Sequence, residues 1–420
     1  MEKAFVVGAV NAFLTGEERL YAIEGRATGF VTPGETLILT DPGRDTDRVH
    51  RVTVTKVCLR KGKELEPVSK AGECNLVVYF ESNTDLKLRN GIVLHSEGVA
   101  PEAVRKAYLN VLGNVFVVAR DLDLNEKDFN CMELTDLVEI WRCFWQYSAN
   151  RHHSGKESDK YKERLDRLMD AVCEKVFELD GLNIVYSKRT NEPFMYNLMH
   201  KRGKGGVYCS LPDVIIVTDA DKERVMAKLD PDFYELRHVS KENMIPFLGG
   251  CFYINGAAGV RFNDTDARIP AEVMVERPSD EGEEEGNISN PELERWILLL
   301  NQLPDSERNE GSVAFGLFAR EMEKEIVKAK FLIPAQKEGE GFKIAVQEGK
   351  GEKSAARIYT DWGKFRIVYD SSWSGLVQTL EEVLDRYDAI INVTGQTTRA
   401  IYFTKEDLDR IESGNSSNRK

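Results

Sequence analysis

The 420-residue sequence lacks any apolar run near the ~20 residues that a membrane-spanning helix needs. Its seven cysteines are scattered and include no C-x-x-C pair, which argues against a disulfide framework and a zinc ribbon. Basic residues are not in surplus: 57 Lys and Arg stand against 70 Asp and Glu, and this net charge of −13 opposes DNA binding. The first residues lack a small-residue cleavage site. We therefore expect a cytoplasmic protein with reduced, mostly buried thiols and no membrane partner.

The composition, 42% hydrophobic and 30% charged, is that of a soluble globular protein, and the length allows roughly three domains. Residues 1–97 contain several short β-type runs, among them ETLILTD and NLVVYFES. Thr32-Pro33-Gly34-Glu35 and Asp41-Pro42-Gly43-Arg44 separate some of these runs, and Pro followed by Gly suits a type II turn. Short strands at regular spacing predict a small β-barrel.

The order of motifs in this barrel resembles the second domain of elongation factor Tu and related translation GTPases. The resemblance extends from Ala4 to about His95 and rests on four motifs. They are Gly25-Arg26-Ala27-Thr28-Gly29, Pro33-Gly34-Glu35, Ala71-Gly72-Glu73 and Arg89-Asn90-Gly91. The resemblance implies a barrel of the kind that contacts RNA and other domains, so association with the ribosome or tRNA is a secondary expectation.

The motifs of a GTPase are missing from the chain. The nearest approach to a P-loop, Gly349-Lys350-Gly351-Glu352-Lys353-Ser354, has Glu where a phosphate cradle needs the bare backbone of glycine. No N-K-x-D motif for guanine occurs. We therefore expect no GTP hydrolysis and assign no cofactor.

Residues 98–159 are predicted to form a helical connector. Its longest apolar stripe has helical spacing and consists of Leu134, Leu137, Val138, Trp141, Phe144 and Trp145. Residues 276–289 are acidic and carry Pro and Gly, which predicts a linker between domains, and Asn290-Pro291 suits the start of a helix. We expect residues 413–420 to be a disordered tail.

Two stretches, CFYINGAAGVRFND at 251–264 and AIINVTGQTTRAIYFT at 389–404, both run through Ile-Asn and a glycine-containing turn into an apolar strand. Thr218-Asp219 and Thr360-Asp361 lie upstream, 142 residues apart, and Ile254-Asn255 and Ile391-Asn392 lie 137 residues apart. Matching order and offset predict tandem copies of one mixed α/β domain, at residues 160–275 and 290–412.

The second copy is similar to the N-terminal domain of the SseB (enhanced serine sensitivity) family. The motifs concerned are Phe331-Leu332-Ile333-Pro334, Ile358-Tyr359-Thr360-Asp361 and Ile391-Asn392-Val393-Thr394-Gly395. The first copy resembles the family in its order of elements, although Ile216-Val217-Thr218-Asp219 lacks the aromatic residue. The resemblance implies a cytoplasmic protein with a regulatory or interaction role and no established enzymatic mechanism. The expected fold is multidomain α+β: the barrel followed by two SseB-like domains.

Four polar residues are candidates for ligand or partner binding: Asp219, Asn255, Asp361 and Asn392. Each Asp follows a strand, where it suits an Asx-turn or helix N-cap, or alternatively a catalytic or metal-binding carboxylate. The Asn residues suit turns. Gly-Ala-Ala-Gly at 256–259 is interpreted as a hairpin turn, the alternative being a phosphate loop. No residue is assigned as catalytic or as a metal ligand.

The function expected from the sequence is that of a non-catalytic adaptor or regulatory protein that binds a protein partner. The alternative is a small-metabolite sensor or enzyme with its site between the two α/β copies, because a cleft between paired domains is a common ligand location.

Overall fold

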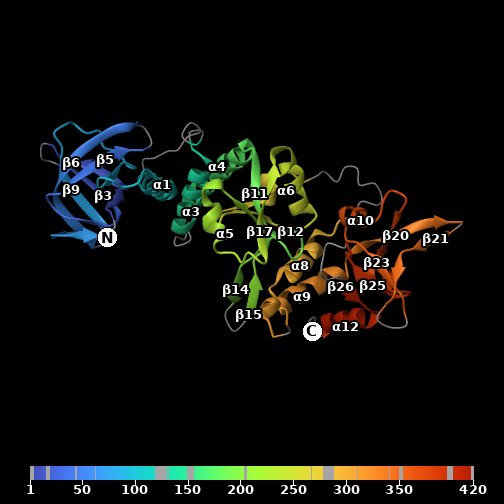
Figure 1. Cartoon of the computed structure of the whole chain (residues 1–420). Coiled ribbons are helices and arrows are strands. Elements are labelled where there is room, and N and C mark those ends of the chain that lie inside the picture. The colour runs from blue at the N-terminus through green and yellow to red at the C-terminus, as the bar shows by residue number, and fades with distance from the viewer. Residues whose placement is uncertain are drawn as a thin grey trace. The chain divides into compact units, whose positions relative to one another are not determined.

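The computed structural model shows a mixed α+β chain of two compact units, Met1–Val176 and Phe177–Lys420 (Figure 1). The structure describes residues 4–15, 19–42, 45–61, 63–118, 129, 132–148, 156–202, 206–265, 267–277, 288–309, 311–339, 341–349, 353–394 and 401–417. Most of the predicted linker 276–289 lies outside them. None of the helices in these ranges combines the length and apolar character needed to cross a membrane.

Unit 1 begins with a sheet that closes on itself, because β1 pairs with both β10 and β3. The six strands of this closed sheet are β1 (Val6–Gly8), β10 (Val93–His95), β5 (Thr36–Asp41), β6 (Asp45–Lys61), β9 (Asn75–Glu81) and β3 (Leu20–Thr28). Shorter strands are β2 (Asn11–Leu14), β4 (Phe30–Val31), β7 (Glu64–Val68) and β8 (Ala71–Gly72). Alternating side chains such as Val7, Ile23 and Phe80 fill the interior.

In the described part of unit 1 the sheet is followed by α1 (Pro101–Val118), α3 (Leu134–Ser148) and α4 (Lys156–Glu178), the last two residues of which belong to unit 2. The side chains of Leu137, Val138 and Trp141 on α3 are buried, as the predicted apolar stripe requires. α1 and α3 pack against each other, and Arg105 on α1 forms an ion pair with the buried Asp136 on α3.

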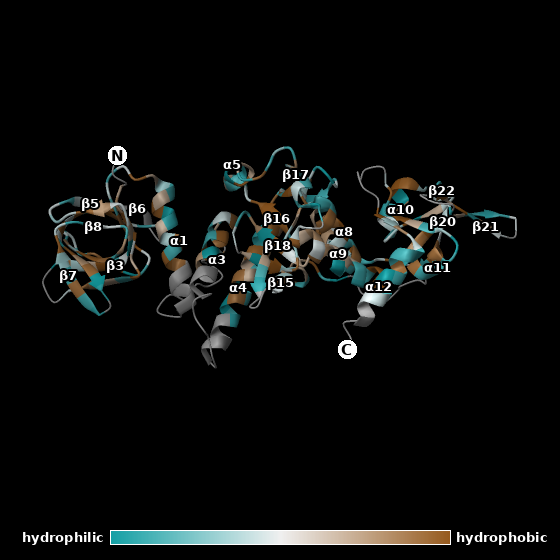
Figure 2. Cartoon of the chain, turned by 90° about the horizontal axis from the view of Figure 1, so that it is seen from below, coloured by the Kyte–Doolittle hydropathy of each residue, from teal (hydrophilic) through white to brown (hydrophobic). Residues whose placement is uncertain are grey.

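The first half of unit 2 (residues 177–277) holds a twisted sheet with helices. Its strands are β11 (Gly181–Ser187), β12 (Glu192–Pro193), β13 (Met195–Tyr196), β16 (Asp213–Val217), β17 (Tyr234–Ser240), β18 (Gly259–Phe262) and β19 (Arg268–Pro270), with a separate hairpin of β14 (Met199–Arg202) and β15 (Gly206–Cys209). Its helices are η2 (Asp219–Asp221), α5 (Lys222–Met226), η3 (Lys241–Asn243), α6 (Met244–Tyr253) and α7 (Ala271–Met274). The all-buried strand β16 is brown, and so hydrophobic, in Figure 2.

The second half of unit 2 (residues 288–417) begins with α8 (Pro291–Gln302), η4 (Asp305–Glu307) and α9 (Val313–Ile326), and α8 starts at the predicted Asn290-Pro291. Its strands are β20 (Lys330–Glu338), β21 (Gly341–Ile344), β22 (Val346–Gln347), β23 (Ala355–Ile358), β24 (Ser374–Thr379), β25 (Asp388–Ile391) and β26 (Ile401–Phe403). Its other helices are α10 (Trp362–Val368), α11 (Leu380–Leu384) and α12 (Lys405–Ser417). The expected disorder from 413 is therefore wrong up to Ser417, and 418–420 lie outside the described residues.

The same strand pairings occur in both halves. β11 pairs antiparallel with β17 and β16. In the same way β20 pairs antiparallel with β24, and an antiparallel bridge between Leu332 and Tyr359 joins β20 to the end of β23. β16 runs parallel to β18, and β23 runs parallel to β25. β19 and β26 then add antiparallel to β18 and β25. The two halves thus share the chain order and the pairing of five strands.

The strand–turn–strand interpretation of CFYINGAAGVRFND is wrong in its first part. Cys251, Phe252 and Tyr253 form the last turn of α6, and Ile254 is its C-cap. Met244, Leu248, Cys251 and Phe252 are buried at helical spacing, so the segment forms a helix on the sheet. Gly256–Gly259 therefore connects a helix to a strand, and the hairpin interpretation fails with it. In the second stretch β25 and β26 do pair antiparallel, and 395–400 lie outside the described residues.

The counterpart of Asn392 in the first half is Asn263, and the predicted match with Asn255 is wrong. Asn263 and Asn392 each follow the second parallel strand with a left-handed backbone, φ 55° and 54°. The Oδ1 atom of each accepts the backbone N–H of a threonine, Thr218 at 2.9 Å and Thr360 at 3.0 Å. These equivalent bonds tie the ends of the two parallel strands together in each half.

Gly256 is required by a close approach of the chain. Its φ is +74°, and a Cβ built on it would lie 2.0 Å from the carbonyl oxygen of Pro291 at the start of α8. We expect Gly256→Ala to lower the free energy of unfolding by about 2 kcal/mol, because a side chain adds backbone strain and displaces α8. Urea unfolding measures this loss.

Gly249→Ala is the matched control, since this glycine lies inside α6 and a Cβ there meets no other part of the chain within 4 Å. It should stabilise the protein by about 0.5–1 kcal/mol through helix propensity. Equal effects of the two substitutions would contradict the role of Gly256.

Candidate functional site

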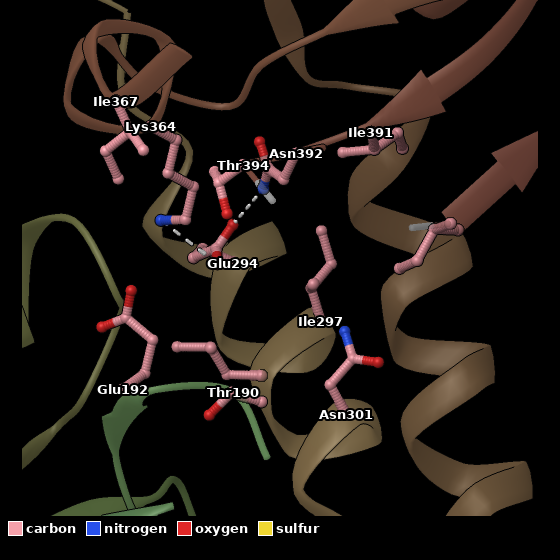
Figure 3. A pocket seen from close by; sticks show the side chains of 12 residues that line it. Thr190, Glu192, Glu294, Ile297, Asn301, Lys364, Ile367, Ile391, Asn392 and Thr394 are labelled. Atoms are coloured by element: carbon pink, nitrogen blue, oxygen red, sulfur yellow. Dashed lines mark hydrogen bonds and ion pairs between the residues drawn. The ribbon is translucent and has the colours of Figure 1, made fainter. Parts of the chain in front are cut away.

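A small cavity of about 30 Å³ lies where the two halves of unit 2 meet (Figure 3). Thr190 and Glu192 line it from the first half, Glu294 and Ile297 from α8, and Lys364 and Asn392, among others, from the second half. We call this group of side chains, together with Thr360, Asp361 and Asn255 behind them, the seam cluster.

Helix α8, the first helix of the second half, makes hydrogen bonds both to the first half and to the rest of its own half. Near its C-terminus, the buried Gln302 accepts the backbone N–H of Met195 at 2.9 Å and donates to the carbonyl oxygen of Pro193 at 2.9 Å. Just before its N-terminus, Asn290 donates its amide to the carbonyl oxygens of Lys330 and Thr360. α8 thereby fixes Glu294 in the seam between the halves.

Glu294 is the most buried charged residue of the cluster, with 1% of its surface exposed. Its Oε2 accepts hydrogen bonds from Asn392 Nδ2 at 2.8 Å and Thr360 Oγ1 at 3.0 Å, and its Oε1 lies 3.2 Å from Lys364 Nζ. Figure 3 shows the contacts to Asn392 and Lys364 as dashed lines. Both carboxylate oxygens therefore have donors, the condition for burying such a group.

Asp361 confirms its predicted position as a helix N-cap. Its Oδ1 accepts the backbone N–H of Lys364 at 2.9 Å, in the first turn of α10. Its Oδ2 lies 3.1 Å from Lys364 Nζ and 3.0 Å from Thr360 Oγ1, whose single proton is shared between this oxygen and Glu294 Oε2. Lys364 thus joins two buried carboxylates, one from its own helix and one from α8.

Asn255, at the end of α6, reaches the cluster through Glu192. Its Nδ2 donates to Glu192 Oε2 at 3.0 Å. Among the described residues no donor contacts the other oxygen of Glu192, and Figure 3 shows this carboxylate pointing towards Lys364 across the cavity. Three of the four predicted residues, Asp361, Asn392 and Asn255, therefore converge on one site.

Asp219 lies outside this site. Its side chain is 84% exposed, and it contacts Lys222 Nζ at 2.7 Å and Asn183 Nδ2 at 3.0 Å. It lies within η2 after Thr218 and caps no helix, so the N-cap interpretation is wrong for this residue. In this half Asp221 accepts from Thr218 and Asn263, the partners equivalent to those of Glu294.

Three residues of the site were missed: Glu192, Glu294 and Lys364. A repeated T-D-x-x-K pattern at 218–222 and 360–364 is present in the sequence and would have identified Lys364. No local pattern identifies the two glutamates, because they come from a two-residue strand and a separate helix.

The electrostatics of the cluster are set by three carboxylates around one ammonium. Burial raises the pKa of Glu294; Lys364 opposes this, and Asp361 and Glu192 add to it. Burial likewise raises the pKa of Glu192, against Lys364 and Asn255. Burial alone would lower the pKa of Lys364, but its three acidic neighbours outweigh burial and raise it. The lysine thus stays charged, and protonation of a glutamate relieves the excess negative charge.

Side chains suited to nucleophilic or metal chemistry are not gathered at this site. Within the described ranges no three His, Cys, Asp or Glu side chains come together as metal ligands. Burial raises the pKa of Cys143 and of Cys173 to about 12, and it raises the pKa of Cys251 as well, so these thiols are protonated at neutral pH. The arrangement can hold two halves together and exchange a proton.

No family model matches the sequence, and no curated protein matches it.

Proposed function

We propose that this chain is a non-catalytic cytoplasmic adaptor that binds a protein partner. In this proposal unit 1 carries an elongation-factor-like barrel, and unit 2 consists of two SseB-like domains derived by duplication. The shared pairing of five strands and the equivalent Thr–Asn bonds support the duplication. The near balance of acidic and basic residues in 1–97 makes a protein partner preferable to the ribosome or tRNA.

The size of the seam cavity is the observation on which the non-catalytic role rests. Ligand pockets for metabolites usually span ~300–1,000 Å³. A cavity of about 30 Å³ accommodates on the order of two water molecules. The hydrogen bonds of Glu294, Thr360 and Asn392 are made to one another, so these groups act as a joint within unit 2.

Chemical crosslinking in cells, followed by purification of the full chain and identification of attached proteins, tests the adaptor role. The same protein partner should be recovered in repeated experiments, and a matched purification of an unrelated acidic protein should not contain it. Absence of any specific protein under several growth conditions would overturn the proposal.

The second candidate function is a small-metabolite sensor or enzyme with its site at the seam. The observation in its favour is the position of the cavity, between the two halves and beside two glutamates with raised pKa. A thermal-shift screen of amino acids and nucleotides tests it, because a ligand that binds the folded state raises the melting temperature. If no compound changes the melting temperature, this candidate is rejected.

A further inference from the structure

The edge strand β24 of the second half is uncharged along its whole length. It reads Ser-Gly-Leu-Val-Gln-Thr, from Ser374 to Thr379. Among the described residues it pairs only with β20, so its other edge presents backbone groups of Gly375 and Val377 to the surroundings, while the Thr379 N–H at its end is bonded to Glu382 Oε2 at 2.8 Å. Val377, in the middle of the strand, is 40% exposed.

The equivalent strand of the first half is protected. β17 reads Tyr-Glu-Leu-Arg-His-Val-Ser, and it carries Glu235, Arg237 and His238. His238 pairs with Asn183 on β11 as Val377 pairs with Leu332 on β20. Charged residues on an edge strand discourage the addition of a further strand. The two halves share one architecture, yet only one of them keeps this protection.

The opposite edges of the two sheets differ in the same way. In the first half β19 carries Arg268 and Pro270, and proline cannot donate a ladder hydrogen bond. In the second half the equivalent β26 is Ile401-Tyr402-Phe403. Protection is therefore absent from both edges of the second half, and β24 is the longer of the two strands.

We propose that β24 pairs antiparallel with β24 of a second copy of this chain, so that the two sheets become continuous across a two-fold axis. With the axis beside Val377, each Val377 lies opposite the Val377 of the other copy. Leu332, the partner of Val377 on β20, bonds to Tyr359 on its far side, and this leaves the N–H and C=O of Val377 facing outwards. Leu376 then lies opposite Gln378, and Gly375 opposite Thr379. No like charges face each other in this register, and an apolar β-branched pair lies at its centre.

This pairing does not rest on the proposed adaptor function. It is expected to be reversible. Six residues from each copy form an interface below the ~1,200 Å² of stable complexes, so the dimer should dissociate on dilution. In a two-fold interface each substitution is present once in each copy. A single charged residue near the axis therefore changes the dissociation constant strongly.

Sedimentation of the full chain over a hundredfold range of concentration tests the proposal. The wild type should shift from monomer towards dimer, and Val377→Lys should raise the dissociation constant at least about tenfold, since like charges near the axis disfavour pairing. His238→Lys, at the equivalent position of β17, is the matched control and should leave the dissociation constant unchanged. A wild type that is monomeric at every concentration, or equal effects of both variants, would overturn the proposal.

Hydrogen exchange gives a second measurement that does not depend on the stability of a variant. In the wild type, amides of residues 374–379 should gain protection as concentration rises, and those of residues 234–240 should not. Unchanged exchange in 374–379 would count against pairing through β24 even if the chain dimerises, because another surface would then form the dimer.

Discussion

Lys364→Met should lower the free energy of unfolding of unit 2 by about 3–5 kcal/mol at pH 7.5. The substitution keeps the apolar stem and removes the ammonium that lies 3.2 Å from Glu294 and 3.1 Å from Asp361. Both carboxylates are buried, so water cannot replace the lost partner. Hydrogen exchange of β23 and β25 along a urea series measures the loss in this unit directly.

Lys222→Met is the matched control, because Lys222 occupies the same place in the other T-D-x-x-K pattern but pairs with a largely exposed aspartate. Its effect should stay within about 0.5 kcal/mol. Adding Glu294→Gln to Lys364→Met should restore part of the lost stability by removing one uncompensated charge. If both lysine variants lower the free energy of unfolding equally, the ion pairs of Lys364 in the seam cluster do not stabilise unit 2 more than an exposed ion pair does.

The stability of unit 2 should fall as the pH rises above 4.5, the ordinary pKa of a glutamate, through the raised pKa values of Glu192 and Glu294. A raised pKa means that the folded state binds the proton more tightly than the unfolded state. Folding is then favoured while the carboxyl groups are protonated, and this advantage disappears as they ionise. Each unit of pKa elevation corresponds to about 1.4 kcal/mol for each group.

Glu192→Gln separates this effect from the rest of the molecule. The amide still offers an oxygen to Asn255, and Asp361, Glu294, Lys364 and Arg237 remain as the charged groups around it. The difference in unfolding free energy between this variant and the wild type should grow in favour of the variant between pH 5 and pH 8. A constant difference over this range would show that Glu192 does not titrate within the fold.

Local sequence patterns predict much of the fold. They fail where a short apolar run is compatible both with the 3.6-residue period of a helix and with a buried strand. The short β-type runs and turn residues in 1–97 predict strands that the structure contains, and one face of these strands fills the interior. The run CFYI on its own predicts a strand, yet Met244, Leu248, Cys251 and Phe252 have helical spacing. The helix prevails because this stripe packs on the sheet, and the error moved the match for Asn392 from Asn263 to Asn255.

The seam cluster shows what a local pattern cannot supply. Asp361 and Asn392 were identified because each follows a strand, where a polar side chain can bond the backbone. Glu294 lies 66 residues from Thr360 and 98 residues from Asn392, and only the packing of α8 brings these side chains together. Glu294 is buried because α8 packs against segments distant in the sequence. The spacing of residues along α8 therefore does not predict its burial.

The two contacts of α8 fix the length of this helix as well as its position. Glu294 bonds to the second half and Gln302 to the first, and the eight helical steps from one to the other span about 12 Å. One extra residue between them would rotate Gln302 by about 100° relative to Glu294, so that the hydrogen bonds of Glu294 and those of Gln302 could not form together. An insertion or deletion within α8 should therefore break one of these two sets of hydrogen bonds, so the length of this helix is under selection together with its side chains.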